Sequence, residues 1–204
     1  MDDRIARALS FLFHPLLVPT YILLTLLNLD RMYTVLLTWQ LNLFIIGTVL
    51  VTTFFLPLLI IFIMYRIKLI SSLYLSQREE RIFPLITIAI FYYLTFYLMK
   101  QLYLPTCFQI FLLGASVIAI ISLITTFFFR ISLHMTALGA ASGLFLSMTI
   151  ISGGAGLFLL IISVIISGMV GSARLKLNAH QPAEIYSGWL MGAVVICLTC
   201  LLLF

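Results

Sequence analysis

The sequence predicts an all-α fold: a polytopic integral membrane bundle of about six or seven transmembrane helices. Of 204 residues, 64% are hydrophobic and 8% charged, and the mean hydropathy is +1.26. Soluble domains carry about 25% charged residues. Uncharged stretches long enough to cross the roughly 30 Å hydrocarbon core recur along the chain, without the ten-residue alternation of a membrane β-barrel. We therefore expect one transmembrane domain, residues 1–204, and, despite a pI of about 9.3, no nucleic-acid partner.

Seven segments are long and apolar enough to be spans. They lie at residues 9–29, 40–65, 83–103, 106–129, 134–150, 156–173 and 184–204. We expect Pro15 and Pro19 to break the first span early, because proline disrupts a helix interior. The turn-forming cluster at residues 152–156 separates the fifth span from the sixth. Pro84 and Pro105 fall at span starts, where a missing N–H costs little.

Seven spans assign each connecting segment to one of two membrane faces. The N-terminal face, called side A, receives most of the basic residues: Arg4, Arg7, Arg66, Lys68, Arg78, Arg81, Arg130, Arg174 and Lys176. Arg31 and Lys100 are assigned to the opposite face, and His14, His134 and His180 lie at or near side A. The positive-inside rule would make side A cytoplasmic. An anion-binding site on side A is the competing interpretation, and the sequence leaves both open.

Three successive side-A segments hold most of the reactive side chains: residues 78–81, 132–134 and 174–184. Together they offer arginines, two histidines and carboxylates at one membrane depth. Arginine binds phosphate oxygens in a bidentate manner. One histidine could attack phosphorus while the other protonates the leaving oxygen, and a carboxylate could orient the nucleophile. The pattern therefore indicates phosphoryl transfer.

The segment from residue 171 to 192 resembles a signature of a known family. It contains Arg174, five residues, His180, three residues, Glu184 and a glycine-containing helix. This is similar to the third signature of the type 2 phosphatidic acid phosphatase (lipid phosphate phosphatase) superfamily, with Glu184 where the family has Asp.

The other two signatures are matched in part. Residues 131–134 are similar to the second signature, Pro-Ser-Gly-His, and keep Ser132 and His134. Residues 78–84 are similar to the end of the first signature, which closes on Arg-Pro. The resemblance covers roughly residues 76–192, which we expect to form the phosphatase-like core.

The resemblance implies a metal-independent hydrolase, without a cofactor, that removes a phosphate or diphosphate group from a membrane lipid. The implied catalytic residues are His180, a nucleophile that forms a phosphohistidine, Glu184, its orienting carboxylate, and His134, the general acid. The implied phosphate-binding residues are Arg174, Arg81, Arg78 and Ser132. The resemblance also implies a multi-pass protein of the cell inner membrane whose partners are the bilayer and its lipid phosphate substrate.

The residues predict two local features of this core. Pro182 suits the first turn of the last helix, which places His180 just before that helix and Glu184 in its first turn. Small residues four apart let membrane helices approach closely. The Gly139/Gly143 and Gly188/Gly192 pairs therefore predict that the spans beginning near residues 134 and 184 pack together.

Three alternatives remain open at the level of sequence. A relative of the family could be non-catalytic, or the chain could be a small lipid transporter or scaffold. The third is an intramembrane metalloprotease, because the pair Glu79-Glu80 and the spacing of His180 and Glu184 superficially suggest metal ligands.

Overall fold

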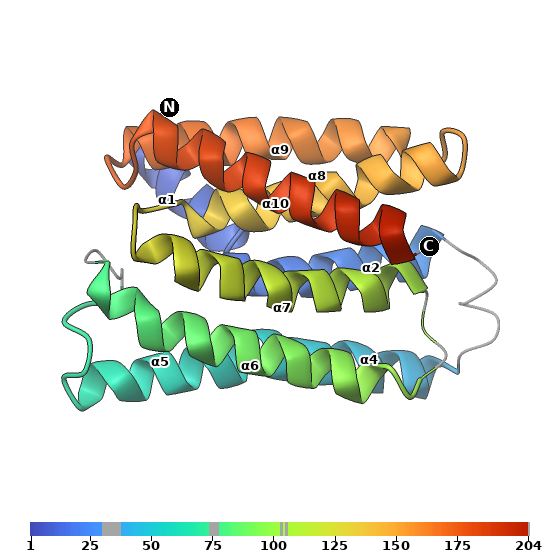
Figure 1. Ribbon diagram of the computed structural model, residues 1–204, viewed down its shortest axis with the longest axis horizontal. Helices are drawn as coiled ribbons and strands as arrows, with labels where there is room; N and C mark the ends of the chain where they lie inside the picture. Colours follow the sequence, from blue (N-terminus) through green and yellow to red (C-terminus); the bar gives the residue numbers. More distant parts are fainter. Residues whose placement is uncertain (30–37, 74–77, 103, 105, 204) are drawn as a thin grey trace. The chain divides into compact units, whose positions relative to one another are not determined.

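The protein is helical wherever its structure is described. The computed structural model describes residues 1–29, 38–73, 78–102, 104 and 106–203, and every regular element in these ranges is a helix (Figure 1). Seven helical stretches are long and apolar enough to cross a membrane: Asp3–Leu29, Trp39–Arg66, Glu79–Met99, Phe108–Thr126, Leu133–Ile151, Leu157–Lys176 and Pro182–Leu203. The all-α membrane class and the seven expected spans are thereby confirmed. Arg31 and Pro105 lie outside the described residues.

The first span is interrupted at Pro15, as predicted, whereas Pro19 lies in the first turn of α2, where proline is tolerated. It consists of α1 (Asp3–Leu12), the 3-10 turn η1 (Pro15–Leu17) and α2 (Val18–Leu29). The Asp2 side chain caps α1 by accepting a hydrogen bond from the Arg4 amide. Pro15 stands at the first position of η1, where its missing N–H leaves no bond unmade.

Contact clustering divides the chain into two compact units. Unit 1 comprises residues 1–18 and 130–204, and unit 2 comprises residues 19–129. The expected phosphatase-like core, residues 76–192, therefore draws on both units.

Unit 2 contains α2, α4 (Trp39–Leu50), the π-helical turn η2 (Val51–Phe55), α5 (Leu56–Arg66), the 3-10 turn η3 (Glu79–Arg81), α6 (Ile82–Met99) and α7 (Thr106–Thr126). Helix α6 packs against α7, α5 and η2. At the π-turn, Thr95 of α6 donates to the Thr52 hydroxyl at 2.8 Å. This buried bond joins two spans at a point where the helical ladder is widened.

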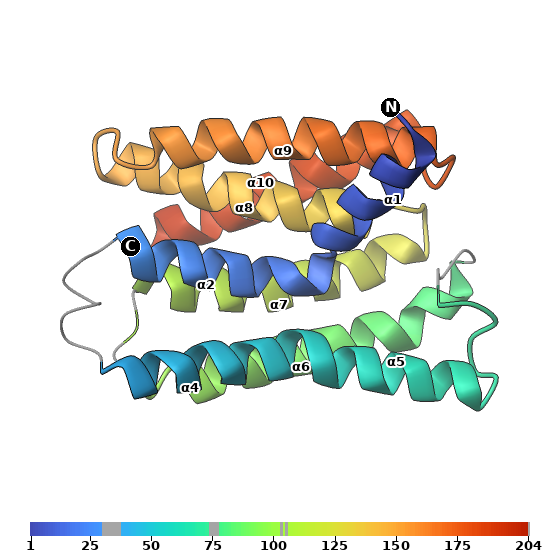
Figure 2. The same cartoon turned by 180° about the vertical axis from the view of Figure 1, so that it is seen from behind.

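Unit 1 contains α1, η1, α8 (Leu133–Ile151), α9 (Leu157–Lys176) and α10 (Pro182–Leu203). Helix α8 packs against both α10 and α9. Helix α1 packs against α9, as Figure 2 shows. The turn between α8 and α9 occupies the predicted cluster, with Gly153 and Gly154 at φ values of 65° and 127° that favour glycine.

The glycine pairs on α8 and α10 lie at a close contact between these two helices. A Cβ atom at Gly139 would overlap the backbone of Trp189, and one at Gly192 would overlap the backbone of Thr136. Backbone therefore meets backbone along this seam, which only glycine allows. The predicted packing of the two motif-bearing spans is confirmed.

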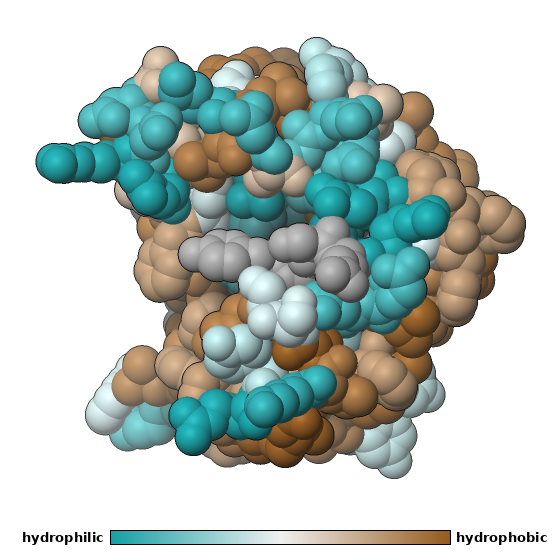
Figure 3. Space-filling model, turned by 90° about the vertical axis from the view of Figure 1, so that its left-hand side faces the viewer, coloured by the Kyte–Doolittle hydropathy of each residue, from teal (hydrophilic) through white to brown (hydrophobic). Residues whose placement is uncertain are grey.

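The beginnings of α8 and α10 and the end of α9 lie at the same end of unit 1 (Figure 1). Hydrophilic residues gather over the helix ends that face the viewer in Figure 3. Because α8, α9 and α10 are of membrane-spanning length, we expect these ends to lie at the depth of the lipid head groups.

Candidate functional site

A histidine and a carboxylate form the centre of the site. His180 Nδ1 lies 2.5 Å from Glu184 Oε2, and the His180 side chain is only 4% exposed. An ionised carboxylate can only accept a hydrogen bond, so the ring proton belongs on Nδ1 and the lone pair on Nε2. This is the tautomer that a nucleophilic histidine requires.

The turn before α10 places His180 where Glu184 can reach it. Helix α9 ends at Lys176. Two residues later Asn178 has a φ of 51°, and the Ala179 amide donates back to the Arg174 carbonyl at 3.1 Å. Asparagine tolerates this left-handed conformation, and the hydrogen-bond pattern is that of a Schellman motif. The chain then enters α10 at Pro182, as the sequence predicts. His180 precedes the helix, and Glu184 lies in its first turn.

Glu184 also has a local structural role. Its Oε2 accepts a hydrogen bond from the Gln181 amide at 3.4 Å. A glutamate in the third position of a helix often reaches back in this way to cap the first turn. The same carboxylate thus caps α10 and orients His180, which ties the position of the imidazole to the start of the helix.

Arg130 holds the carboxylate from the opposite side. Its Nε lies 3.5 Å from Glu184 Oε1, and its Nη2 donates to the Ala179 carbonyl at 2.9 Å. One guanidinium therefore contacts both the turn before α10 and the carboxylate within it. The planar fork of arginine suits this double contact better than a lysine ammonium would.

Ser132 lies at the start of α8, against the first turn of α10. Its amide donates to the Glu184 carbonyl at 3.0 Å, and the residue is fully buried. Although Ser132 is the N-cap residue of α8, its side chain makes no capping hydrogen bond. Its hydroxyl oxygen has no hydrogen-bond partner within the described residues. A buried hydroxyl without a partner costs free energy of folding. Such a hydroxyl is available to form a hydrogen bond with a bound ligand.

Arg174, in the last turn of α9, carries a second buried hydrogen-bond donor. Its Nε is buried without a hydrogen-bond partner in the described part of the chain. Arg174 lies within electrostatic range of Arg130, His14 and His134. A buried guanidinium N–H beside other cationic or ionisable groups is the environment in which an anion is stabilised.

His134 lies in the first turn of α8, within electrostatic range of His180. Its Nε2 is 3.1 Å from the backbone carbonyl oxygen of Ser10 in α1. Its ring meets that of His14 edge to face, with 5.6 Å between the centroids. The N-terminal segment therefore contributes directly to the surroundings of this histidine.

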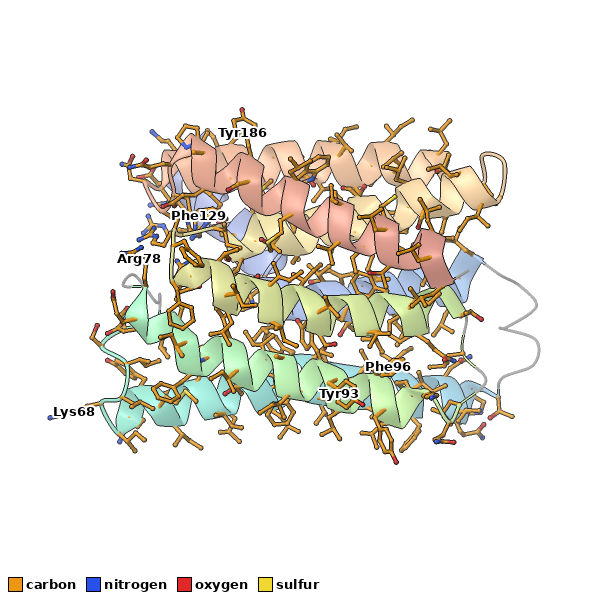
Figure 4. All side chains as sticks on the ribbon, viewed as in Figure 1. Lys68, Arg78, Tyr93, Phe96, Phe129 and Tyr186 are labelled. Carbon is orange, nitrogen blue, oxygen red and sulfur yellow. The ribbon has the colours of Figure 1, made fainter. Side chains whose placement is uncertain are left out.

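Arg78 and Arg81 belong to unit 2. Arg78 Nη1 donates to the Phe128 carbonyl at 3.1 Å, near the labelled Phe129 in Figure 4. Arg81, in η3, is 6% exposed.

Unit 1 brings together five of the seven predicted site residues: His134, His180, Glu184, Arg174 and Ser132. The contribution of Arg78 and Arg81 stays a prediction.

Two neighbours of the site received no role from the sequence. Arg130 could have been singled out because it directly precedes the second motif segment. His14 offered a weaker signal, since a histidine next to a proline near an apolar span has many structural explanations. Its contact with His134 joins residues 120 positions apart, which no local pattern reveals.

No group of three or more His, Cys, Asp or Glu side chains is arranged to hold a metal ion within the described ranges. Comparisons of the chain with protein-family models, curated proteins and solved structures found no match.

Proposed function

We propose that this multi-pass membrane protein is a phosphatase that hydrolyses a phosphate or diphosphate group from a membrane lipid through a phosphohistidine at His180. The observation that carries the proposal is the 2.5 Å contact between His180 Nδ1 and Glu184 Oε2. This contact puts the ring proton on Nδ1 and the lone pair on Nε2, which is the atom that would attack phosphorus.

Each remaining group supports one part of the reaction. His180 Nε2 attacks phosphorus, the bond from phosphorus to the lipid oxygen breaks, and His134 donates a proton to that oxygen. Water then attacks the phosphohistidine, the phosphorus–nitrogen bond breaks, and His134 takes a proton from the water. Arg174 Nε and the Ser132 hydroxyl, both buried donors without hydrogen-bond partners among the described residues, would contact the phosphate oxygens.

The place of the site fits a lipid substrate. His180 and Glu184 lie at an end of unit 1 that belongs at head-group depth, where a lipid phosphate is found. The start of α10 adds its N-terminal dipole, which favours an anion by a few tenths to about 1 kcal/mol. On the resemblance of its motifs, we place the protein in the cell inner membrane and assign Arg78 and Arg81 to further phosphate contacts.

The test is a phosphate-release assay on purified protein in mixed micelles containing EDTA. The substrates are phosphatidate, a prenyl diphosphate and a phosphorylated glycolipid. We expect release from at least one lipid, and its loss in His180→Ala. The matched control is Tyr186→Phe on the same helix, which is 72% exposed and points away from unit 1 (Figure 4). A wild-type protein inert on all three lipids, or a fully active His180→Ala, would refute the proposal.

The orienting carboxylate is tested in the same assay. We expect Glu184→Gln to lower kcat by about 10²-fold or more, since loss of an orienting carboxylate leaves the wrong histidine tautomer. The control is Glu79→Gln, the same chemical change at an exposed residue of η3. A larger loss from Glu79→Gln than from Glu184→Gln would contradict this assignment.

A further inference from the structure

The N-terminal segment contacts the histidine that is proposed as the general acid. Ser10 lies near the end of α1, and its carbonyl oxygen is 3.1 Å from His134 Nε2. A carbonyl can only accept a hydrogen bond, so Nε2 of His134 carries a proton. The proton that His134 exchanges must therefore be held on its other ring nitrogen, Nδ1.

His14 is itself held in one orientation. It is the N-cap residue of η1, and its Nδ1 accepts a hydrogen bond from the Leu16 amide at 3.3 Å. Its ring stands at 78° to that of His134, with the edge of one ring against the face of the other. Such pairs are favourable beyond the area that they bury. Because η1 packs against α8, the His14 ring limits the rotation of the His134 ring.

We propose that α1 and η1 form a positioning element for His134. In this arrangement, the Ser10 carbonyl and the His14 ring hold His134 so that it gives and takes its catalytic proton through Nδ1. The inference rests on the proposed function and adds a positioning residue, His14, that none of the three signature-like segments contains.

The proton balance is complete at His134. In the acid form that the reaction requires, both ring nitrogens carry protons, and the second proton is taken up at Nδ1 when the anionic lipid phosphate binds. When the bond from phosphorus to the lipid oxygen breaks, the Nδ1 proton moves to that oxygen and leaves the neutral ring with its proton on Nε2, bonded to the Ser10 carbonyl. When water attacks the phosphohistidine, Nδ1 receives a proton from the water. The Ser10 bond is kept throughout, so the ring need not turn between the two steps.

A comparison of leaving groups separates positioning from a loss of folding. A lipid alkoxide needs a proton in order to leave, whereas p-nitrophenolate leaves without one. We expect His14→Ala to lower kcat on the lipid phosphate on the order of tenfold more than kcat on p-nitrophenyl phosphate, because a displaced general acid affects only the first reaction. KM for the two substrates should change little. Equal losses on both substrates would overturn the proposal.

Two variants control the experiment. His14→Phe keeps a ring against His134 and should recover more than half of the lost selectivity for the lipid phosphate. A loss equal to that of His14→Ala would contradict a role for the ring contact. Phe11→Ala removes a side chain that is 74% exposed on the same segment. It should leave the ratio of the two kcat values within twofold of wild type, and a tenfold change would show that the ratio reports general damage to the segment.

A spectroscopic readout is independent of activity. The chain contains three histidines, so the NMR spectrum of protein labelled with ¹⁵N-histidine contains signals from three imidazole rings. The His134 signals are assigned by their loss in His134→Gln. Above the pH at which this ring becomes neutral, we expect the tautomer protonated at Nε2, and a mixture of tautomers in His14→Ala. A ring protonated at Nδ1 in the wild type would refute the inference even if lipid hydrolysis is found. An inert wild type with the expected tautomer would refute the proposed function instead.

Discussion

At the scale of single residues, the Ser132 hydroxyl is expected to affect stability and phosphate binding in opposite directions. Its hydroxyl is buried without a hydrogen-bond partner in the described ranges, although its backbone contacts the first turn of α10. A buried polar group without a partner costs about 1–3 kcal/mol. A residue retained for stability alone would not carry this cost, whereas a donor for a bound phosphate would.

We therefore expect opposite effects of Ser132→Ala on two measurements. The thermal unfolding midpoint in detergent should stay constant or rise, because the variant removes an unsatisfied hydroxyl. KM for the lipid phosphate should rise several-fold, because a phosphate contact is lost. The control is Ser163→Ala. The Ser163 hydroxyl lies within hydrogen-bond distance of both the Ser142 hydroxyl and the Leu160 carbonyl, so its loss should lower the midpoint. A lowered midpoint with an unchanged KM in Ser132→Ala would contradict the assignment.

His180 and Glu184 illustrate what a motif predicts about single residues. Pro182 predicted that His180 precedes α10 and that Glu184 lies in its first turn, and the family resemblance implied that Glu184 orients His180; the two side chains lie 2.5 Å apart. The ion pair of Glu184 with Arg130 was not predicted. It joins the start of α8 to the start of α10, and such a contact depends on how these two helices pack.

At the scale of elements, the glycine seam between α8 and α10 determines where the site residues meet. These two helices carry Ser132 and His134 at one start and Glu184 at the other. Because backbone meets backbone at Gly139, Gly143 and Gly192, the relative register of the two starts is closely defined. The sequence predicted this pairing because small residues four apart are a local pattern.

Gly192→Ala should disturb the seam. A Cβ atom there would overlap the Thr136 backbone, so the helices must separate, at a cost of about 1–3 kcal/mol. We expect a clearly lower unfolding midpoint in detergent and a reduced lipid phosphatase rate. The matched control is Gly168→Ala on α9, where a Cβ atom would meet nothing within 4 Å and where alanine is the better helix former. If both variants unfold at the wild-type midpoint, the close packing of α8 on α10 is wrong.

The first span shows where local reasoning about elements falls short. The prolines predicted an early break, and η1 begins at Pro15. They did not predict that the chain before the break belongs to unit 1 while residues 19–29 belong to unit 2. The break allows α1 to pack against α9 and brings Ser10 to His134, a contact between residues 124 positions apart.

At the scale of the whole molecule, seven spans predict that the candidate site lies on the same membrane face as the N-terminus. The segments after Arg66 and after Lys176 should then face one side of the membrane, and the turn between α8 and α9 the other. This orientation follows from the number of spans alone.

Cysteine accessibility in sealed vesicles tests this topology. Starting from a chain without Cys107, Cys197 and Cys200, single cysteines are introduced as Ile67→Cys, Lys176→Cys and Ala155→Cys. An impermeant maleimide should modify the first two from one side only and the third from the other. Modification of Ala155→Cys and Lys176→Cys from the same side would mean that α9 does not cross the membrane.

The sequence by itself determined the all-α membrane class and the seven candidate spans, and it predicted a common face for the reactive residues. These depend on hydropathy, length and the positions of charges, which are local because a span must satisfy its own backbone hydrogen bonds. Only the tertiary structure decided that Arg130 pairs with Glu184, that Ser132 and Arg174 keep donors without partners among the described residues, and that Ser10 and His14 contact His134. Those contacts join segments far apart in the chain, so they follow from the packing of α1, α8, α9 and α10 and not from any local pattern.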